Sequence, residues 1–131
     1  MDRKLEEALK RIEQSIQQPQ QQLLTKSVTF VYTVESGKGV KLEEPSPVTG
    51  YISEVTMHFP DGCNGLVEMA LHYKDRRVFP IKGYIKLNNA TPTWQVYHPV
   101  KKGEPIWVEI LNHDSLNSHT PSVTVVLRGV E

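Results

Sequence analysis

The stretch GYISEVTMHFPDGCNGLVEMALHY, residues 50–73, decides the fold of this chain. In its first part, apolar side chains alternate with polar ones at Tyr51, Val55, Met57 and Phe59. After the turn-forming segment PDGCNG, residues 60–65, the alternation resumes at Val67, Met69, Leu71 and Tyr73. A period of two is typical of a strand with one buried face. Two such strands on either side of a turn predict antiparallel β-structure.

The same alternation continues on both sides of this stretch. Further strands are predicted at residues 28–34, 40–43, 77–79, 84–87, 93–97, 106–110 and 123–128. Eight or nine short strands, separated by turn residues and with no helix between them, predict an all-β antiparallel β-sandwich over residues 23–131. Connections of about five to ten residues favour crossings between two sheets, as in a jelly roll.

Residues 1–18 differ from the rest and predict one short amphipathic helix. Its apolar positions are spaced by four, three and four residues, as in a short coiled coil, at Leu5, Leu9, Ile12 and Ile16. Pro19 ends the helix, and residues 19–22 are predicted to be a Gln/Pro linker. A helix this short is marginal alone in water, so the four apolar residues should bind a neighbouring molecule or the chain's own sheet.

Length, charge and cysteine content exclude several classes of protein. The chain has 131 residues and a mass of 14.9 kDa, which fits one domain. Fifteen basic and fifteen acidic residues give a net charge of zero, so neither nucleic acid nor an anionic membrane is an expected partner. One cysteine excludes a disulfide framework and a cysteine-built zinc site.

The sequence also gives an expectation about location. The first residues have no apolar core and no cleavage site of a secretory signal, and no stretch approaches the roughly 20 apolar residues of a membrane span. We expect a cytoplasmic protein, or a virion component if the source is a virus.

Histidines are the first candidates for chemistry. His113, Asp114 and His119 share one loop, where imidazole and carboxylate groups are suitable ligands of a divalent ion. The same loop composition is also typical of a hydrogen-bonded turn, which is the favoured interpretation. His58 and His72 fall on the polar side of their strands and should face solvent.

No catalytic or cofactor motif is found in the sequence. Cys63 lies in a turn-forming sequence, and nothing nearby in the sequence identifies a base that would activate it. There is no glycine-rich phosphate loop, nucleophile elbow, paired zinc-binding histidine motif or cupin-type H-x-H. We therefore expect no enzyme activity, no metal and no cofactor.

The two tryptophans differ in their expected surroundings. Trp94 alternates with Val96 and should lie in the core. Trp107 and Leu111 have the opposite parity to the apolar residues of their strand, so they should project from its second face and bind a partner. In an alternative interpretation, Trp107 is an aromatic platform for a sugar, completed by Tyr97, His113, Asp114 and His119.

Residues 50–130 resemble the small jelly-roll or sandwich domains of virion accessory proteins of tailed phages and archaeal viruses, including capsid decoration proteins. The resemblance is carried by the stretch quoted first, by LNNATPTWQVYHPVKKGEPIWVEILNHD at 87–114, and by HTPSVTVVLRG at 119–129. It implies that a short helix outside the sandwich mediates trimerisation or docking on a shell. It implies no catalytic residue.

These observations favour a non-enzymatic structural or assembly protein, a virion accessory or capsid decoration subunit. It would form a homo-oligomer, with a trimer as the first expectation, and would bind a capsid or other virion protein. A carbohydrate-binding or adhesin-like β-sandwich module is the alternative, and a metal-dependent small β-barrel protein is the second alternative.

Overall fold

The structure is a computed structural model that describes residues 23–131. This part of the chain contains eight strands and no helix, which confirms the predicted all-β class. The strands are β1 (Leu24–Val31), β2 (Gly39–Pro45), β3 (Thr49–His58), β4 (Val67–Tyr73), β5 (Arg76–Phe79), β6 (Thr93–Val100), β7 (Pro105–Asn112) and β8 (Ser122–Val130). The predicted helix at 1–18 and the linker at 19–22 lie outside the described residues.

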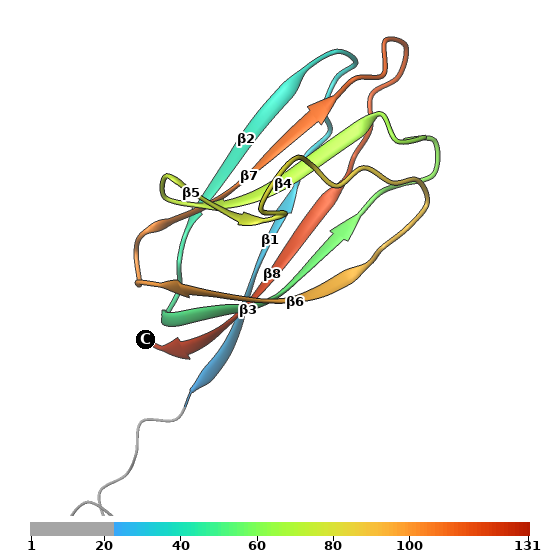
Figure 1. Cartoon of the computed structure of the whole chain (residues 1–131). Helices are drawn as coiled ribbons and strands as arrows, with labels where there is room; N and C mark the ends of the chain where they lie inside the picture. The colour runs from blue at the N-terminus through green and yellow to red at the C-terminus, as the bar shows by residue number, and fades with distance from the viewer. Residues whose placement is uncertain (1–22) are drawn as a thin grey trace, which may run out of the picture.

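The strands form two four-stranded antiparallel sheets packed face to face (Figure 1). One has the order β1-β8-β3-β6 and the other β2-β7-β4-β5. The first strand therefore pairs with the last, the second with the seventh, the third with the sixth and the fourth with the fifth. This nested pairing is the strand order of a jelly roll.

The core lies between the sheets and is built from the alternating apolar side chains of both. Its fully buried members include Ile52, Val55, Met57, Phe59, Val67, Met69, Leu71, Ile106, Val108, Ile110, Val123, Val125 and Leu127. Trp94 and Val96 pack against this cluster from β6, in agreement with the prediction for Trp94. The period of two in the sequence therefore corresponds to one buried face on each strand.

Two strands depart from the simple alternation. In β3 the register shifts between Ile52 and Glu54, so Ser53 is an extra residue and the parity of the strand changes there. As a result Ile52, not Tyr51, enters the core ahead of Val55. The prediction that Tyr51 shares the buried face is therefore wrong.

The other corrections concern strand ends. β1 stops at Val31, so Tyr32 is exposed, and Val34 returns to the core through a bridge with His119. Residues 84–87 do not form the ninth strand, because only Ile85 pairs, in an isolated bridge with Met69.

The two ends of the sandwich have different contents. The connections at 32–38, 59–66 and 113–121 meet at one end. At the other end, the beginning of β1 lies beside the end of β8, because Leu24 pairs with Gly129 (Figure 1). Gly129 also faces Gly50 of β3, and no side chain would fit between these two backbones.

Candidate functional site

Trp107 and Leu111 lie on the outer face of the sheet β2-β7-β4-β5, as their parity predicts, and both are half-buried. The indole of Trp107 stacks on the imidazole of His72, with ring centroids 3.8 Å apart, and its Nε1 donates to the carbonyl of Lys74 at 2.7 Å. The Lys41 ammonium lies 5.0 Å from the centroid of the indole. The large ring is therefore packed against neighbours from β2 and β4 of its own sheet.

His72 is consequently less exposed than its polar parity predicts. It does point to the outer face, but Trp107 covers it, and its Nε2 is buried without a hydrogen-bond partner. Burial lowers the pKa of the imidazole, and the positive charges of Arg77 and Lys41 lower it further, with Glu109 acting in the opposite direction. His58 is exposed as predicted, and its Nδ1 contacts Thr91 Oγ1 at 2.7 Å.

The rest of this outer face also consists of mutual contacts. The Tyr84 hydroxyl donates to Glu109, and the Arg77 guanidinium lies 5.1 Å from the centroid of the Tyr84 ring. Further along the sheet, Glu68 Oε2 lies 3.2 Å from His113 Nε2. The polar groups around Trp107 and Leu111 are thus largely satisfied by one another, and the partner-binding role of these two residues stays a prediction.

Tyr97 lies on the other sheet. It projects outward from β6, where its ring lies 5.1 Å from that of Tyr51, whereas Trp107 lies on the outer face of the opposite layer. The ligand site proposed from the sequence, with Tyr97 and Trp107 together, is therefore wrong as a single site. Strand parity gives the face of a sheet on which a residue lies but not which of two sheets contains the strand.

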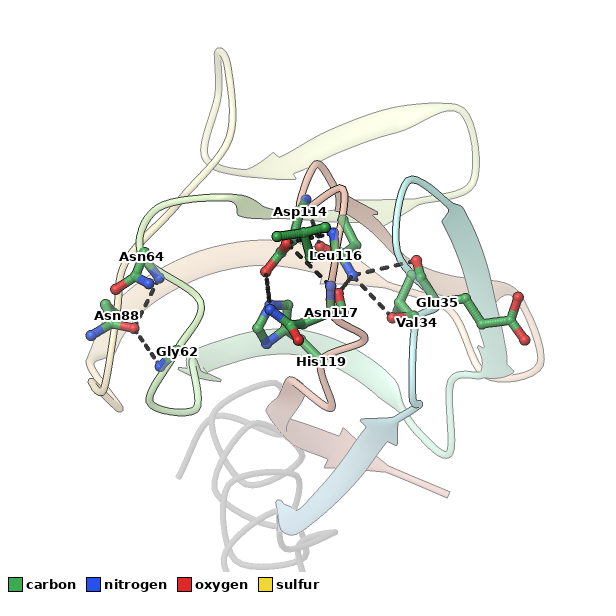
Figure 2. A network of polar contacts seen from close by, with 10 residues as sticks. Val34, Glu35, Gly62, Asn64, Asn88, Asp114, Leu116, Asn117 and His119 are labelled. Atoms are coloured by element: carbon green, nitrogen blue, oxygen red, sulfur yellow. Dashed lines mark hydrogen bonds and ion pairs between the residues drawn. The ribbon is translucent and has the colours of Figure 1, made fainter.

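Asp114 and His119 form a buried pair at the end of the sandwich where three connections meet (Figure 2). Nε2 of His119 donates to Oδ2 of Asp114 at 2.8 Å, and Oδ1 accepts the backbone N–H groups of Leu116 and Asn117. The N–H of Leu116 and then the imidazole of His119 hold the pKa of the Asp114 carboxyl at about 2. Both carboxylate oxygens are therefore engaged in closing their own loop.

Asn112 connects this loop to the connection between β1 and β2. Its buried side-chain amide donates to the carbonyls of Val34, Glu35 and Asn117 at 3.1, 3.3 and 3.0 Å, and its oxygen accepts the N–H of Asp114. The network has the pattern of a structural clamp, in which buried polar groups satisfy one another. Sequence analysis favoured such a hydrogen-bonded loop but did not identify Asn112 as its centre.

His113 does not join this network, because it leaves the loop on the outer face and contacts Glu68. Within residues 23–131, no group of three or more His, Cys, Asp or Glu side chains is arranged to hold a metal ion. The three loop residues that suggested a divalent site from the sequence are thus divided between two different contacts.

Cys63 is fully buried near the same end of the sandwich. Burial raises the pKa of its thiol, and the negative charges of Asp114 and Asp61 raise it further. A nucleophilic cysteine needs the opposite change, a lowered pKa at an accessible position. Here the thiol is a small core side chain.

The four sheet edges differ in a way that the sequence did not reveal. An unpaired strand edge can add a strand from another molecule, and proteins usually block this with charges, proline, bulges or short strands. β2 contains Lys41, Glu43, Glu44 and Pro45; β5 has four residues, two of them arginine; and β6 contains Pro99 and lies opposite the bulge. These three edges carry such protection.

β1 is the exception among these edges. It has eight residues in continuous register with β8, contains no proline, and has one charged residue, Lys26, which forms an ion pair with Glu131. Within residues 23–131, no strand pairs with its other side. Exposed apolar residues lie at both ends, at Leu23 and Leu24 and at Val31 and Tyr32. The outer edge of β1 with these residues, 23–32, is here called the β1 edge.

One further property concerns membranes. In the part of the chain that the structure describes, no helix has the length and apolar character needed to cross a bilayer.

Comparisons with known proteins add information on the fold. No protein-family model matches the sequence, and no curated protein sequence matches it significantly. Among solved structures, the crystal structure of FLHE is 13% identical, with a TM-score of 0.52 over 84% of this chain and 99% of that chain. A protein of Bacillus endospore appendages, described as disulfide-linked pili, is 13% identical, with a TM-score of 0.51 over 86% of this chain and 91% of that chain.

Viral capsid proteins also occur among the similar structures, at lower scores. The cyanophage Pam1 capsid asymmetric unit is 16% identical, with a TM-score of 0.40 over 82% of this chain and 83% of that chain. The likenesses to FLHE and to the appendage protein show that this chain shares their β-sandwich fold, and they show the fold alone.

Proposed function

We propose that this chain is a non-enzymatic structural subunit that associates with copies of itself within a larger assembly. The observation that supports the proposal is the β1 edge, an eight-residue strand whose second side pairs with nothing within residues 23–131. Addition of a strand to such an edge is a common mode of protein association. The specific role that we propose is a virion accessory or capsid decoration subunit, following the resemblance of residues 50–130.

The chemistry of the β1 edge suits a second copy of the same strand. Because Lys26 is its one charged residue and is neutralised by Glu131, two copies would not strongly repel each other. In an antiparallel pairing about a two-fold axis at Val28, Leu24 of one copy lies opposite Tyr32 of the other. Both side chains are exposed in the single chain, at 39% and 49%, and would be covered in the pair.

The N-terminal prediction adds a second contact in this proposal. The apolar positions of residues 1–18 precede β1 directly in the chain, so a helix there would emerge beside the edge. A trimer held by the helix and a dimer held by β1 have different masses. Both contacts together would give a larger assembly.

The test is the absolute mass of the full chain in solution, measured by light scattering on a sizing column. We expect a multiple of the 14.9 kDa chain mass. The double variant Ser27→Lys and Val31→Lys adds charge to the β1 edge at exposed positions and should lower the mass. The matched variant Ser115→Lys and Leu116→Lys adds the same charge on an exposed loop and should keep the wild-type mass.

Three results would count against the proposal. A full chain that stays a single copy at the highest concentration tested would contradict self-association. An edge variant that keeps the wild-type mass would show that β1 is not the contact. Mass spectrometry of virus particles from the source would contradict the virion role if the chain were missing from them.

A further inference from the structure

The outer face of the sheet β1-β8-β3-β6 contains a groove of about 550 Å³. It crosses all four strands of the sheet. The residues that line it are Thr25, Tyr51, Ser53, Glu54, Gln95, Val96, Val126 and Arg128. A volume of this size lies within the range of ligand sites in proteins, and nothing in the proposed self-association uses it.

The β-bulge in β3 shapes the groove. Ser53 is the extra residue, and its hydroxyl donates to the carbonyl of Val126 on β8 at 3.2 Å. On either side of it, Tyr51 and Glu54 line the groove, whereas Ile52 points into the core. Bulges are a common means of redirecting side chains at functional sites.

Two tyrosines stand at one end of the groove. The rings of Tyr51 and Tyr97 lie 5.1 Å apart and are inclined by 34°. The side chain of Tyr97 is 74% exposed, although a tyrosine could cover much apolar surface if it were packed down. A sugar ring carries C–H groups on one face, and these pack on the electron-rich face of an aromatic ring.

The polar side chains of the groove supply both kinds of hydrogen-bonding group. Arg128 lies opposite Tyr51, and Glu54 lies opposite Gln95 on β6. A guanidinium donates, a carboxylate accepts, and an amide does both, which matches the hydroxyl groups around a sugar ring. Within residues 23–131, neither Glu54 nor Arg128 forms a salt bridge.

The opposite face of the sandwich differs in this respect. There, the Trp107 ring is stacked on His72, and the charges near it are paired or lie over aromatic rings. A ligand would have to displace those contacts before it could reach the indole. The groove with Tyr51 and Tyr97 offers aromatic and polar groups without that cost.

We propose that the Tyr51–Tyr97 groove binds an uncharged oligosaccharide. One cationic and one anionic group line it, so its net charge favours neither an acidic nor a basic sugar. Tyr97 packs on the face of a sugar ring, while Glu54, Gln95 and Arg128 bind its hydroxyl groups. The groove is open along the sheet, so it accommodates a chain of sugar units rather than a single enclosed one.

The test begins with the full chain on an array of immobilised oligosaccharides. The array carries neutral chains of glucose, galactose, mannose and N-acetylglucosamine, together with sialylated and sulfated chains. We expect saturable binding to a neutral chain. The soluble form of that oligosaccharide is then titrated by calorimetry into the wild type and variants.

The variants separate the groove from the rest of the surface. Tyr97→Ala should lose about ten-fold or more in affinity, because it removes an exposed aromatic contact without touching the core. Glu54→Gln keeps the shape of the groove and should lose affinity through its weaker acceptor. Tyr84→Ala and Trp107→Ala, both on the other sheet, should bind as the wild type does.

The outcomes are clear for each arm. No binding to any neutral chain, or equal binding by wild type and Tyr97→Ala, would overturn the proposal. Preference for sialylated or sulfated chains would overturn the uncharged assignment, and loss of binding in Trp107→Ala alone would move the site to the other sheet. Since mass and sugar binding are measured separately, a single-copy protein that binds the sugar would contradict only the proposed self-association.

Discussion

The imidazole ring of His72 lies flat on the indole ring of Trp107, with centroids 3.8 Å apart and planes 6° from parallel. The stack closes the centre of one outer face and buries the Nε2 of His72 without a hydrogen-bond partner. A buried imidazole of this kind is stable when it is neutral and costly when it is charged.

The first prediction is a loss of stability in acid. Since the pKa of His72 is lowered from its ordinary value of 6.5, the unfolded chain binds a proton more readily than the folded one. The free energy of unfolding should therefore fall as the pH drops below 6.5, until the pH is below the lowered pKa. Urea unfolding on both sides of pH 6.5 measures it.

Two variants assign this pH dependence. His72→Phe keeps a flat ring against Trp107 and removes the titrating group, so the fall should become smaller. His58→Phe, at an exposed position, should keep the wild-type fall. An unchanged fall in His72→Phe would show that other groups cause it.

The second prediction concerns the clamp at Asn112. In Asn112→Ala, the carbonyls of Val34, Glu35 and Asn117 lose the amide that donates to them, and the N–H of Asp114 loses its acceptor. Loss of partners for several buried groups should lower the free energy of unfolding by about 2 to 4 kcal/mol. Denaturant unfolding at neutral pH is the measurement.

Asn117→Ala is the matched control for the clamp. The side-chain amide of Asn117 reaches only Asp114 Oδ2, at 3.5 Å, so the loss should be below about 1 kcal/mol. Equal losses in the two variants would contradict the central position of Asn112.

The third prediction concerns the close approach of β3 and β8. A Cβ on Gly129 would lie 2.3 Å from the carbonyl oxygen of Thr49, so Gly129→Ala must separate two backbones. The cost should be about 1 to 3 kcal/mol. In Gly39→Ala the close atom is the Leu111 Cδ2, at 2.7 Å, which can rotate away, so thermal unfolding should show a much smaller change.

The fourth prediction tests the parity change at the bulge. Ile52 is fully buried and Tyr51 is half-buried on the outer side, so Ile52→Ala should cost about 2 to 5 kcal/mol and Tyr51→Ala clearly less. The two single variants are compared by denaturant unfolding. The reverse order of stability would mean that Tyr51, not Ile52, fills the core.

Most of the fold could be predicted because alternation is a local property. Val67, Met69 and Leu71 follow one another on one side of a strand, and a single buried face is enough to produce that pattern. The bulge at Ser53 could not be predicted, because an inserted residue changes the parity without any residue type that identifies it. Ile85 forms only a bridge, since the short apolar pattern at 84–87 says nothing about the neighbour that a strand needs.

The candidate sites were harder to predict because they depend on which strands are neighbours. Tyr97 and Trp107 have outward parity on different sheets, and one sequence does not give the order of the strands. For the same reason the open side of β1 was not foreseen, although its residues were expected to form a strand. The hydrogen-bonded loop around Asp114 was predicted, because Asn, Asp and Ser close turns locally.

The strand order has a consequence for synthesis on the ribosome. β8 lies between β1 and β3, so neither of these earlier strands has its neighbour until residues 122–130 have emerged. The nascent chain must therefore hold β1 unpaired through almost the whole of translation, and its sheet closes only afterwards, in a slow step dominated by distant contacts. Until that step, β1 is open on both sides, so the interval before release of the chain is when wrong strand pairing between neighbouring nascent chains is most probable.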